Sequence, residues 1–517
     1  MIVFRADASS TIGGGHIYRC LTLAHAIKRQ AAEQQKVQQK IVFVCHLSQG
    51  HMTDLIKAQG FEVLSVEKPL CTADMRQVLI ELQQQYTIDW LIIDHYKINV
   101  HYQKQLKPLV KNLMIIDDLA NRAHHCDLLF DQSLNRHPSD YQPWLTSNEC
   151  GIICGSQFAL LREEFSTLKP QAMIKRKSFN SINKVLIAIS ATDPDNICGQ
   201  VINELEKLPS DSKSKNWQYT IVITSKAQYL ESLKHQIARS PLNIELKLDV
   251  NNMAELMLEH DIAIAAAGGA MLERCAMGLP SIIIGVVDNQ NHIISELKKA
   301  QIAIDVMDKS ELTSQLNSVL GKLQNIDNTS YQVLAKKAFG ICRGDGADYV
   351  AGQLHIKNHF HNNYLQTVTS SHCQLIFDWQ QHPKTRAYSR NPNPPTWDEH
   401  QSWFTKTIKN EQVSFYLLMH QGKPAGFVRL NPAFLEQDSN QQIEREKTAK
   451  EVSIAIAPEC HGKGLGVIAL NLLILLHRDI KLLAFIDTNN IASVKAFERA
   501  GFKPHSQTND GNWYHYK

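Results

Sequence analysis

Residues 2–20 read IVFRADASSTIGGGHIYRC, and this stretch decides the fold of the first half of the chain. Ile2–Arg5 is a short β-branched and aromatic run of the kind that forms a buried strand. The glycines that follow allow a tight turn and a close approach of a ligand to the main chain. Strand, glycine turn and helix in this order are typical of the first unit of a Rossmann-like domain. The pattern places His16 at the mouth of the turn.

A second glycine-rich loop lies near the other end of the chain. Residues 452–466 read VSIAIAPECHGKGLG, a β-rich run followed by alternating glycines and then by an apolar helix. Backbone amides at such a turn can bind a pyrophosphate, and the loop carries no nucleophile. The two loops therefore indicate different chemistries, and the chain is predicted to join two enzymes.

Size and composition indicate a multi-domain globular protein. The chain has 517 residues, and the usual ~100–200 residues per domain predicts about three domains. Basic and acidic residues number 54 and 51, so neither a nucleic acid nor a membrane is expected as a partner. The scattered cysteines, the polar N-terminus and a longest apolar run of only 467–476 predict a cytoplasmic protein without disulfides or membrane spans. The sequence makes no prediction of the oligomeric state.

The first 350 residues alternate short β-branched runs with amphipathic stretches, which is typical of parallel βαβ units. We expect an α/β fold with two sequential Rossmann-like domains, at 1–170 and 180–350, and a polar linker after Pro170 at Lys175–Asn180. Ligands should bind beyond the carboxyl ends of the strands. The predicted strands of the two domains are Ile2–Arg5, Ile41–Cys45, Trp90–Asp94, Leu113–Asp117 and Leu128–Asp131, then Lys184–Ser190, Tyr219–Thr224, Ile244–Leu248, Ile262–Ala265 and Ser281–Ile284.

A linker at 351–370 is expected to lead into a third domain at 371–517. Strands are predicted there at Glu451–Ala457 and Leu482–Ile486, and helices after the glycine loop and at Ala492–Arg499. Gly501 follows the last helix as a C-terminal cap would.

Three segments of the first two domains carry candidate chemistry. A histidine such as His16 has a pKa suited to accepting a proton from water, although a capping or packing role is about equally common. The small-residue loop before Glu273 opens a helix whose free amides suit a diphosphate, and Glu273 could accept hydrogen bonds from ribose hydroxyls. Polar side chains at 288–291 follow an apolar strand. The cluster His124–Asp127 does not predict a metal site, because adjacent side chains of a strand point to opposite faces.

These segments resemble a known family. Arg5–Ser9, Gly15-His16, Arg19–Leu21, Asp94–Tyr96, Asp117-Asp118, Leu160–Phe165, Glu273-Arg274 and Asn289-Gln290 are similar, in this order, to the UDP-2,4-diacetamido-2,4,6-trideoxy-β-L-altropyranose hydrolases of pseudaminic acid biosynthesis. The resemblance covers residues 1–350 and implies a GT-B-like pair of Rossmann-type domains. It implies that His16 is the base for a water that attacks the anomeric carbon with inversion, and that Tyr96 and Asn289 position water or sugar. The substrate-binding residues it implies are Arg5, Asp7, Gly15, Gly268, Gly269, Glu273 and Gln290. Ala191 stands where the family tends to have a glycine.

Residues 371–517 resemble the GNAT N-acetyltransferases, which implies an α+β domain that uses acetyl-CoA as co-substrate and no metal. The resemblance rests on the glycine loop and on Asn490–Ser493 with Phe497-Glu498 and Ala500–Phe502. His461 replaces the usual first residue of the loop. Phe497 replaces a tyrosine that often protonates the CoA thiolate, which leaves that role to solvent or to another group such as Tyr514 or Tyr516. Glu451 is predicted to be the base for the amine, with a solvated strand-edge carboxylate as the equally weighted alternative. The implied acetyl-CoA contacts are His461, Gly462, Lys463, Gly464, Leu465, Gly466, Asn490 and Ser493.

Together the two resemblances predict a bifunctional enzyme that acetylates a UDP-linked 4-amino sugar and then hydrolyses the diacetamido product to UDP and free sugar. The alternative is a GT-B glycosyltransferase fused to an acetyltransferase of unrelated substrate. His16 on a polar turn favours water as the acceptor over a sugar acceptor. A nucleotide-sugar-binding regulator without turnover and an inactive third domain are the remaining alternatives.

Overall fold

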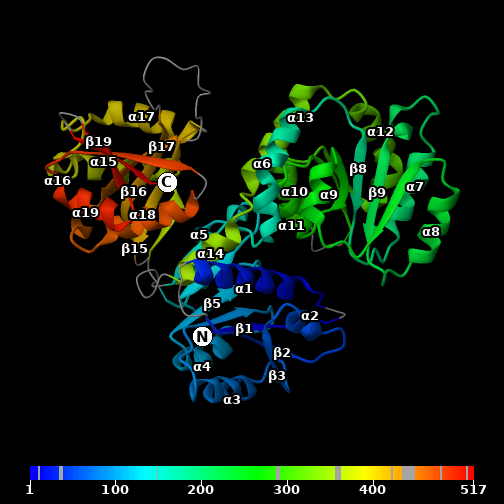
Figure 1. Cartoon of the computed structure of the whole chain (residues 1–517), viewed down its shortest axis with the longest axis horizontal. Coiled ribbons are helices and arrows are strands. Elements are labelled where there is room, and N and C mark those ends of the chain that lie inside the picture. Colours follow the sequence, from blue (N-terminus) through cyan, green and yellow to red (C-terminus); the bar gives the residue numbers. More distant parts are fainter. Residues whose placement is uncertain are drawn as a thin grey trace.

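The computed structural model contains three β-sheets that follow one another along the chain (Figure 1). Among the described residues, no helix is long and apolar enough to cross a membrane. The described residues are 1–9, 12–33, 39–147, 150–286, 291–355, 363–410, 412–420, 423–433, 449–477, 480–507 and 511–516.

The first sheet is parallel and has the order β3-β2-β1-β4-β5-β6-β7. The five strands predicted in this part are confirmed within a residue or two, while β3 and β7 were not predicted. The chain moves outward from β1 to β3 and then returns to the other side of β1 with β4. The strands are β1 (Ile2–Ala6), β2 (Ile41–His46), β3 (Glu62–Val66), β4 (Trp90–Asp94), β5 (Asn112–Ile116), β6 (Leu128–Asp131) and β7 (Gly151–Cys154).

Helices connect most of these strands, as is typical of parallel units, whereas a loop at 117–127 joins β5 to β6. The sequence predicts helices after Gly15, at Met52–Gln59 and at Ala73–Gln85, and these are confirmed as α1, α2 and α3. Helix α1 begins at the last glycine of the opening turn. Their apolar faces pack on a sheet whose central strands are buried throughout. The helices are α1 (Gly15–Glu33), α2 (Thr53–Ala58), α3 (Thr72–Gln83), α4 (Val100–Leu106) and α5 (Pro138–Tyr141).

The second sheet is also parallel, with the order β10-β9-β8-β11-β12-β13. All five predicted strands are confirmed, and β13 was not predicted. The strands are β8 (Lys184–Ala188), β9 (Gln218–Ile223), β10 (Asn243–Leu248), β11 (Ile262–Ala266), β12 (Ser281–Gly285) and β13 (Asp305–Asp308). The helices are α7 (Ile197–Glu206), α8 (Leu230–Arg239), α9 (Met253–Glu259), α10 (Ala270–Ala276), α11 (Asn291–Ala300), α12 (Leu312–Leu323) and α13 (Asn328–Ile341).

The segment expected to be a polar linker after Pro170 is instead largely helical. Helix α6 (Glu163–Lys177) includes Pro170 and ends only after the basic run that suggested a linker. Arg176, within that run, is buried and donates to the carbonyls of Met257 and His260. The prediction was wrong because the basic residues anchor the helix to the second sheet's helices, and because cations favour a helix C-terminus.

Helix α14 (Gly346–His355) carries the chain back from the second part to the first and lies along α1 (Figure 1). Asp348 accepts hydrogen bonds from Arg29 at 2.6 Å, through its carboxylate, and from Gln30 at 2.5 Å, through its carbonyl. The indole of Trp90 donates to the carbonyl of Leu354 at 3.1 Å. The first sheet is therefore completed by a helix that follows the second sheet in sequence.

The third sheet is mixed and has the order β14-β15-β16-β17-β18-β20-β19. Both predicted strands are confirmed as β17 and β18, and the helices predicted to follow each of them as α18 and α19. The strands are β14 (Asn363–Thr367), β15 (Ser414–His420), β16 (Lys423–Pro432), β17 (Ala449–Ile456), β18 (Lys481–Ile486), β19 (Lys503–Gln507) and β20 (Asn512–Tyr516). The helices are α15 (Cys373–Gln381), α16 (Pro383–Arg386), α17 (Trp397–Lys409), α18 (Leu465–Leu476) and α19 (Ile491–Arg499).

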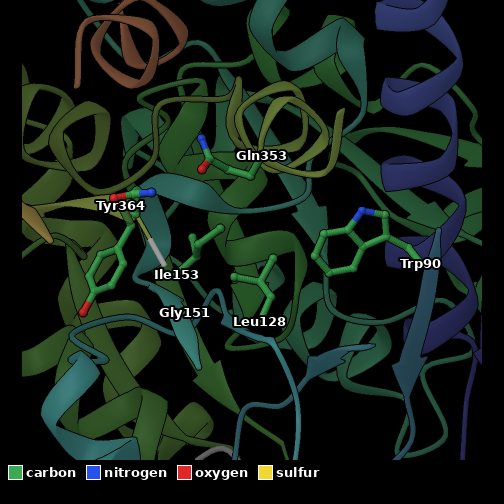
Figure 2. A pocket seen from close by; sticks show the side chains of 7 residues that line it. Trp90, Leu128, Gly151, Ile153, Gln353 and Tyr364 are labelled. Atoms are coloured by element: carbon green, nitrogen blue, oxygen red, sulfur yellow. The ribbon is translucent and has the colours of Figure 1, made fainter. Parts of the chain in front are cut away.

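The third sheet meets the first at a small apolar junction. Figure 2 shows Trp90 and Leu128 from the first sheet facing Gln353 of α14 and Tyr364 of β14 around a small pocket. Strand β14, at one edge of its own sheet, lies beside β7, at the edge of the first sheet. Residues from both sheets form one continuous hydrophobic core. The glycine-rich loop at 461–466 and the loop that carries His16 therefore belong to one connected hydrophobic core.

Candidate functional site

Both parallel sheets change winding direction beside their first strand, and the predicted ligand loops lie at these two positions. In the first sheet the change occurs between β1 and β4, and in the second between β8 and β11. Loops separate at such a point, which leaves room for a ligand beyond the strands' carboxyl ends. His16 follows β1 in the first turn of α1, and Gly268 and Gly269 follow β11.

His16 is held by a buried carboxylate from the neighbouring strand. Its Nδ1 lies 2.6 Å from Oδ1 of Asp94, the last residue of β4. Arg19, one turn further along α1, donates to both oxygens of the same carboxylate, with Nη2 at 2.6 Å from Oδ1. Asp94 is completely buried and the His16 side chain nearly so. The arrangement is a histidine–aspartate pair braced by an arginine.

The charge state of Asp94 fixes the tautomer of His16. Burial by itself raises the pKa of Asp94, but the adjacent Arg19 and then His16 outweigh it and hold the pKa below its usual value. A carboxylate only accepts hydrogen bonds, so Nδ1 of His16 must carry the hydrogen. In a neutral imidazole the remaining lone pair is then on Nε2. His16 can accept a proton at Nε2 while Asp94 stabilises the resulting imidazolium.

Tyr96 lies beside His16, as predicted for a residue of the same site. Its ring packs edge-on against the imidazole at a centroid distance of 4.7 Å, and its hydroxyl donates to Oδ2 of Asp118 at 3.0 Å. Burial and then the nearby Asp118 carboxylate raise the pKa of Tyr96, so the phenol keeps its proton. Asp118 is also paired with Arg19 at 2.9 Å. Tyr96 is 43% exposed and can therefore reach a ligand.

Arg5 and Asp7 lie beneath this site and do not line it. Both side chains are buried and bind each other through two hydrogen bonds of 2.5 and 2.9 Å. Asp7 also accepts from the amide of His46 at 2.7 Å and lies 3.3 Å from Nε2 of His95. Direct contact with a substrate, the role predicted for them, does not fit this geometry. The pair instead ties the ends of β1, β2 and β4 together.

The glycines on both sides of the predicted site border open space. A Cβ atom added to Gly15, Gly268 or Gly269 meets no other atom within 4 Å, and none of the three has a positive φ. Neither conformation nor packing of the protein itself requires glycine at these positions. Close approach of a ligand to the main chain is the remaining physical reason.

Glu273 lies in the first turn of α10, directly after this glycine loop. Burial raises the pKa of its carboxyl group, and its Oε1 lies 3.8 Å from the guanidinium of Arg162 in the chain leading from the first sheet. Asn135, beyond β6, donates to Glu296 of α11 at 2.6 Å. The loop edges of the two sheets are therefore in direct contact.

Two further parts of the predicted site are residues 289–290 and the loop after β8. Asn289 and Gln290 lie outside the described residues. In the loop after β8, Asp193 accepts hydrogen bonds from the amides of Ile197 and Cys198 and so caps α7, while Ala191 is exposed. No group of three or more His, Cys, Asp or Glu side chains within the described part of the chain has the arrangement of a metal site.

The functional residues that sequence reasoning did not assign are Asp94, Arg19 and Asp118. All three belong to the motifs that carried the family resemblance, but their roles depend on which strands are neighbours. An acidic residue at the end of an otherwise apolar strand, such as Asp94 after four apolar residues, is the signal that could have found them.

The third sheet opens where the second glycine loop begins. Strands β17 and β18 pair only at Ala449–Glu451 with Lys481–Leu483, so the strands separate beyond Glu451. A cavity of about 690 Å³ lies in this opening. The predicted contact residues that line it are His461, Gly462, Gly464, Leu465, Gly466, Asn490 and Ser493. Lys463 is not among the lining residues.

The loop itself has the conformation that its glycines allow. Gly462 and Gly464 have φ angles of +79° and +72°, a region that side chains disfavour. Gly464 immediately precedes α18, whose first amides are turned toward the opening. The imidazole of His461 donates from Nε2 to the carbonyl of Ile456 at 2.9 Å, so this unusual first residue fixes the loop to the end of β17.

Neither the predicted acids nor the predicted base of the third domain is among the described residues that line this cavity. Tyr514 is buried, and neither Tyr514 nor Tyr516 is among the described residues that line the cavity, whereas Phe497 and Tyr388 are. Tyr388, in the turn after α16, is 49% exposed and is the one phenol in that described lining. Glu451 lies at the point where β17 and β18 separate and pairs with Arg390 at 2.9 Å.

Comparisons with known proteins agree with this geometry. Residues 364–503 match the model of the acetyltransferase (GNAT) domain, and residues 152–341 match the glycosyltransferase family 28 C-terminal domain. The UDP-2,4-diacetamido-2,4,6-trideoxy-β-L-altropyranose hydrolase of Campylobacter jejuni is 30% identical over 300 residues, which are 58% of this chain and 96% of that protein. The chain belongs to this hydrolase family.

Relatives and solved structures extend the similarity to other parts of the chain. An uncharacterized protein of Methanocaldococcus jannaschii is 23% identical over 99% of this chain and 98% of its own length. The crystal structure of Acinetobacter baumannii MurG covers 68% of this chain and 98% of its own, at 13% identity and a TM-score of 0.48. The aminoglycoside acetyltransferase AAC(6')-Ib in complex with coenzyme A covers 30% of this chain and 94% of its own, at 20% identity and a TM-score of 0.27.

This family member therefore has a GT-B-like pair of Rossmann-type domains followed by a GNAT domain. It is an enzyme with a UDP-sugar hydrolase-like part and an acetyltransferase domain, and its GNAT domain supports the use of acetyl-CoA.

Replacing Gly464 by alanine tests the conformation of the GNAT loop. We expect Gly464→Ala to raise the KM for acetyl-CoA roughly five- to thirtyfold, because a left-handed residue with a Cβ costs roughly 1–2 kcal/mol and distorts the first amides of α18. Gly321→Ala is the matched control, since Gly321 is exposed within α12 and an added Cβ there meets no atom. Steady-state acetylation kinetics measure both variants. An unchanged KM in Gly464→Ala would contradict the role of the loop.

Proposed function

We propose that this chain catalyses two consecutive steps of pseudaminic acid biosynthesis. The GNAT domain transfers acetyl from acetyl-CoA to a UDP-linked 4-amino sugar, and the GT-B-like part hydrolyses the resulting UDP-2,4-diacetamido-2,4,6-trideoxy-β-L-altropyranose to UDP and the free sugar. The His16–Asp94 pair at the winding change of the first sheet is the observation that carries the hydrolytic part. The substrate is that of the Campylobacter jejuni relative.

In the proposed hydrolysis His16 acts as the base. Nε2 accepts a proton from water as the water oxygen bonds to the anomeric carbon, and the bond from that carbon to the diphosphate oxygen breaks with its electron pair leaving on UDP. Attack from the face opposite UDP inverts the anomeric centre. Asp94 stabilises the imidazolium, an electrostatic contribution that is strong because the pair is buried.

The second sheet supplies the proposed UDP site. Gly268 and Gly269 leave the main chain open to a diphosphate, and Glu273 accepts hydrogen bonds from the ribose hydroxyls. The hydroxyl of Tyr96, whose hydrogen is donated to Asp118, presents its oxygen as an acceptor near the sugar. Asn289 and Gln290 keep their proposed roles of positioning water or sugar and binding substrate.

In the proposed acetyl transfer the amine nitrogen attacks the thioester carbonyl carbon. The new C–N bond forms, the C–S bond breaks, and the proton lost by nitrogen ends on the CoA sulfur. The cavity at the opening of β17 and β18 holds acetyl-CoA along residues 461–466, with Asn490 and Ser493 beside it. Tyr388 takes the place of Tyr514 and Tyr516 as the proposed acid, because it lines this cavity.

The proposal is tested by following both reactions in one sample by NMR. Full-length protein with the UDP-linked 4-amino sugar and acetyl-CoA is expected to yield first the N-acetyl product and then UDP with free sugar. Without acetyl-CoA, UDP release should be much slower. Seeing neither N-acetylation nor UDP release would refute the proposal, and transfer of the sugar to an added acceptor would instead identify a glycosyltransferase.

A further inference from the structure

A group of charged and aromatic side chains lies beside the acetyl-CoA cavity but is not part of its lining. At its centre is Glu451, on the last residue pair that joins β17 to β18 before the strands separate. The turn after α16 connects the group to the cavity, because Tyr388 and Ser389 line the cavity and Arg390 follows directly. An acceptor bound here would lie next to the thioester.

Strand register places these side chains on one face of the sheet. Glu451 is opposite Asn431 on β16 and Leu483 on β18, and Arg429 is opposite Ser453, two residues along β17. Paired residues and residues two apart share a face. By the same rule Phe485, two residues after Leu483, and its partner Trp513 on β20 lie on that face. Helix α17 covers part of this face of the sheet through Trp403, whose ring packs against that of Phe415.

Among the described residues, the charges on this face are mainly positive. Arg390 pairs with Glu451 at 2.9 Å, and its guanidinium lies over the rings of Phe485 and Trp513 at 4.7 and 5.5 Å. Arg429 lies over the ring of Trp403 at 5.0 Å. Its Nε is buried and has no hydrogen-bond partner among the described residues.

Further basic groups share the face. Lys481 lies two residues before Leu483 on β18, and His515 is the partner of Leu483 on β20. Glu451 is therefore one carboxylate among several cationic or basic side chains. Such a surface repels a free polyamine and attracts a molecule that carries phosphate.

We propose that this face is the acceptor site of the GNAT domain and that it takes a primary amine carried on a nucleoside diphosphate. The phosphates take the place of Glu451 at Arg390. The planar guanidinium of Arg390 presents a pair of donors suited to phosphate oxygens. Glu451, freed from that pair, binds the amine and positions it at the thioester. The half-buried aromatic rings provide stacking surfaces for the heterocyclic base. We name this set the acceptor cluster: Arg390, Arg429, Glu451, Trp403, Phe485 and Trp513.

The inference rests on the proposed acetyltransferase function and is tested with the full-length protein. Two acceptors are compared, the UDP-linked amino sugar and the same amino sugar without UDP. We expect Arg390→Gln and Arg429→Gln each to raise the KM for the UDP-linked acceptor at least tenfold and to abolish the preference for the UDP-linked over the free amino sugar, while the KM for acetyl-CoA stays within about twofold. Lys406→Gln removes an exposed charge from α17 and serves as the matched control.

A binding measurement separates failure of this inference from failure of the proposed function. Calorimetry with UDP should give two equivalents bound per chain in the wild type, one at the Rossmann-type pair and one at the GNAT domain. The variant Arg390→Gln/Arg429→Gln should bind one equivalent. Unchanged KM values together with unchanged stoichiometry overturn the inference and leave the acetyltransferase intact. If the wild type acetylates no amine, the proposed function fails, and the stoichiometry alone then decides whether the acceptor cluster binds the nucleotide.

Discussion

His16→Leu is expected to lower the rate of UDP release by roughly 10²–10⁴-fold, because the variant has no group that can accept the proton of the attacking water. N-acetylation by the same protein should stay within about twofold of wild type, since the acetyl-CoA cavity is formed by residues of the third sheet and its helices. The two rates are measured on the same samples, with UDP release followed by a coupled assay and acetylation by thiol release.

His25→Gln provides the matched control for this variant. His25 lies on the same helix, α1, and its Nε2 bonds to Gln59, away from Asp94. Both activities of the control should equal those of the wild type. Persistent UDP release in His16→Leu at more than a tenth of the normal rate would show that another group is the base.

Asp94→Asn is expected to impair both hydrolysis and stability. The neutral amide no longer stabilises an imidazolium at His16, so UDP release should fall by roughly 10²–10⁴-fold. The same change leaves Arg19 with Asp118 as its remaining ion-pair partner in a largely buried position, which should lower the free energy of unfolding by about 3 kcal/mol. Denaturant unfolding and UDP release measure the two effects separately.

The sign of the pH dependence follows from the lowered pKa of Asp94. Stability contributed by the ionised carboxylate is present above its unfolded pKa of about 3.9 and is lost as the pH falls through the lower folded value. In Asp94→Asn this acid-labile contribution should disappear. Asp89→Asn is the matched control, because the Asp89 carboxylate is 35% exposed and forms ion pairs with the N-terminus and with the exposed Lys111. This substitution should lower the free energy of unfolding by less than about 1 kcal/mol and leave the rate of UDP release unchanged.

Sequence patterns located most of the two parallel sheets because each central strand is a continuous apolar run bounded by polar turns. The strands that they did not locate in this part of the chain, β3, β7 and β13, all lie at a sheet edge. Strand β3 carries only one buried residue, and β7 and β13 have four residues each. Strand β3 needs few apolar side chains because one flank of this edge strand is not covered by a neighbour, whereas β7 and β13 are too short to show a periodic pattern.

The sequence could predict those candidate residues whose chemistry depends on the local conformation of the chain. His16 and the loop from His461 to Gly466 could be recognised because glycine, helix start and side chain follow one another in sequence. Arg5 and Asp7 were assigned to substrate binding through the family resemblance, which carries no information on burial. Neighbouring strands bury both side chains.

The sequence by itself determined the two glycine-turn units, their helices and the enzyme families to which the two halves are similar. Tertiary structure alone decided that Asp94, far from His16 in sequence, orients its imidazole, and that Arg390 pairs with Glu451. The order of the strands brings β4 beside β1 and so produces the first contact, and the turn after α16 brings Arg390 to β17. Neither arrangement is encoded in the local period of apolar residues. Burial also explains why Asp94 is paired and not solvated, because a buried charge requires a hydrogen-bonded counterpart.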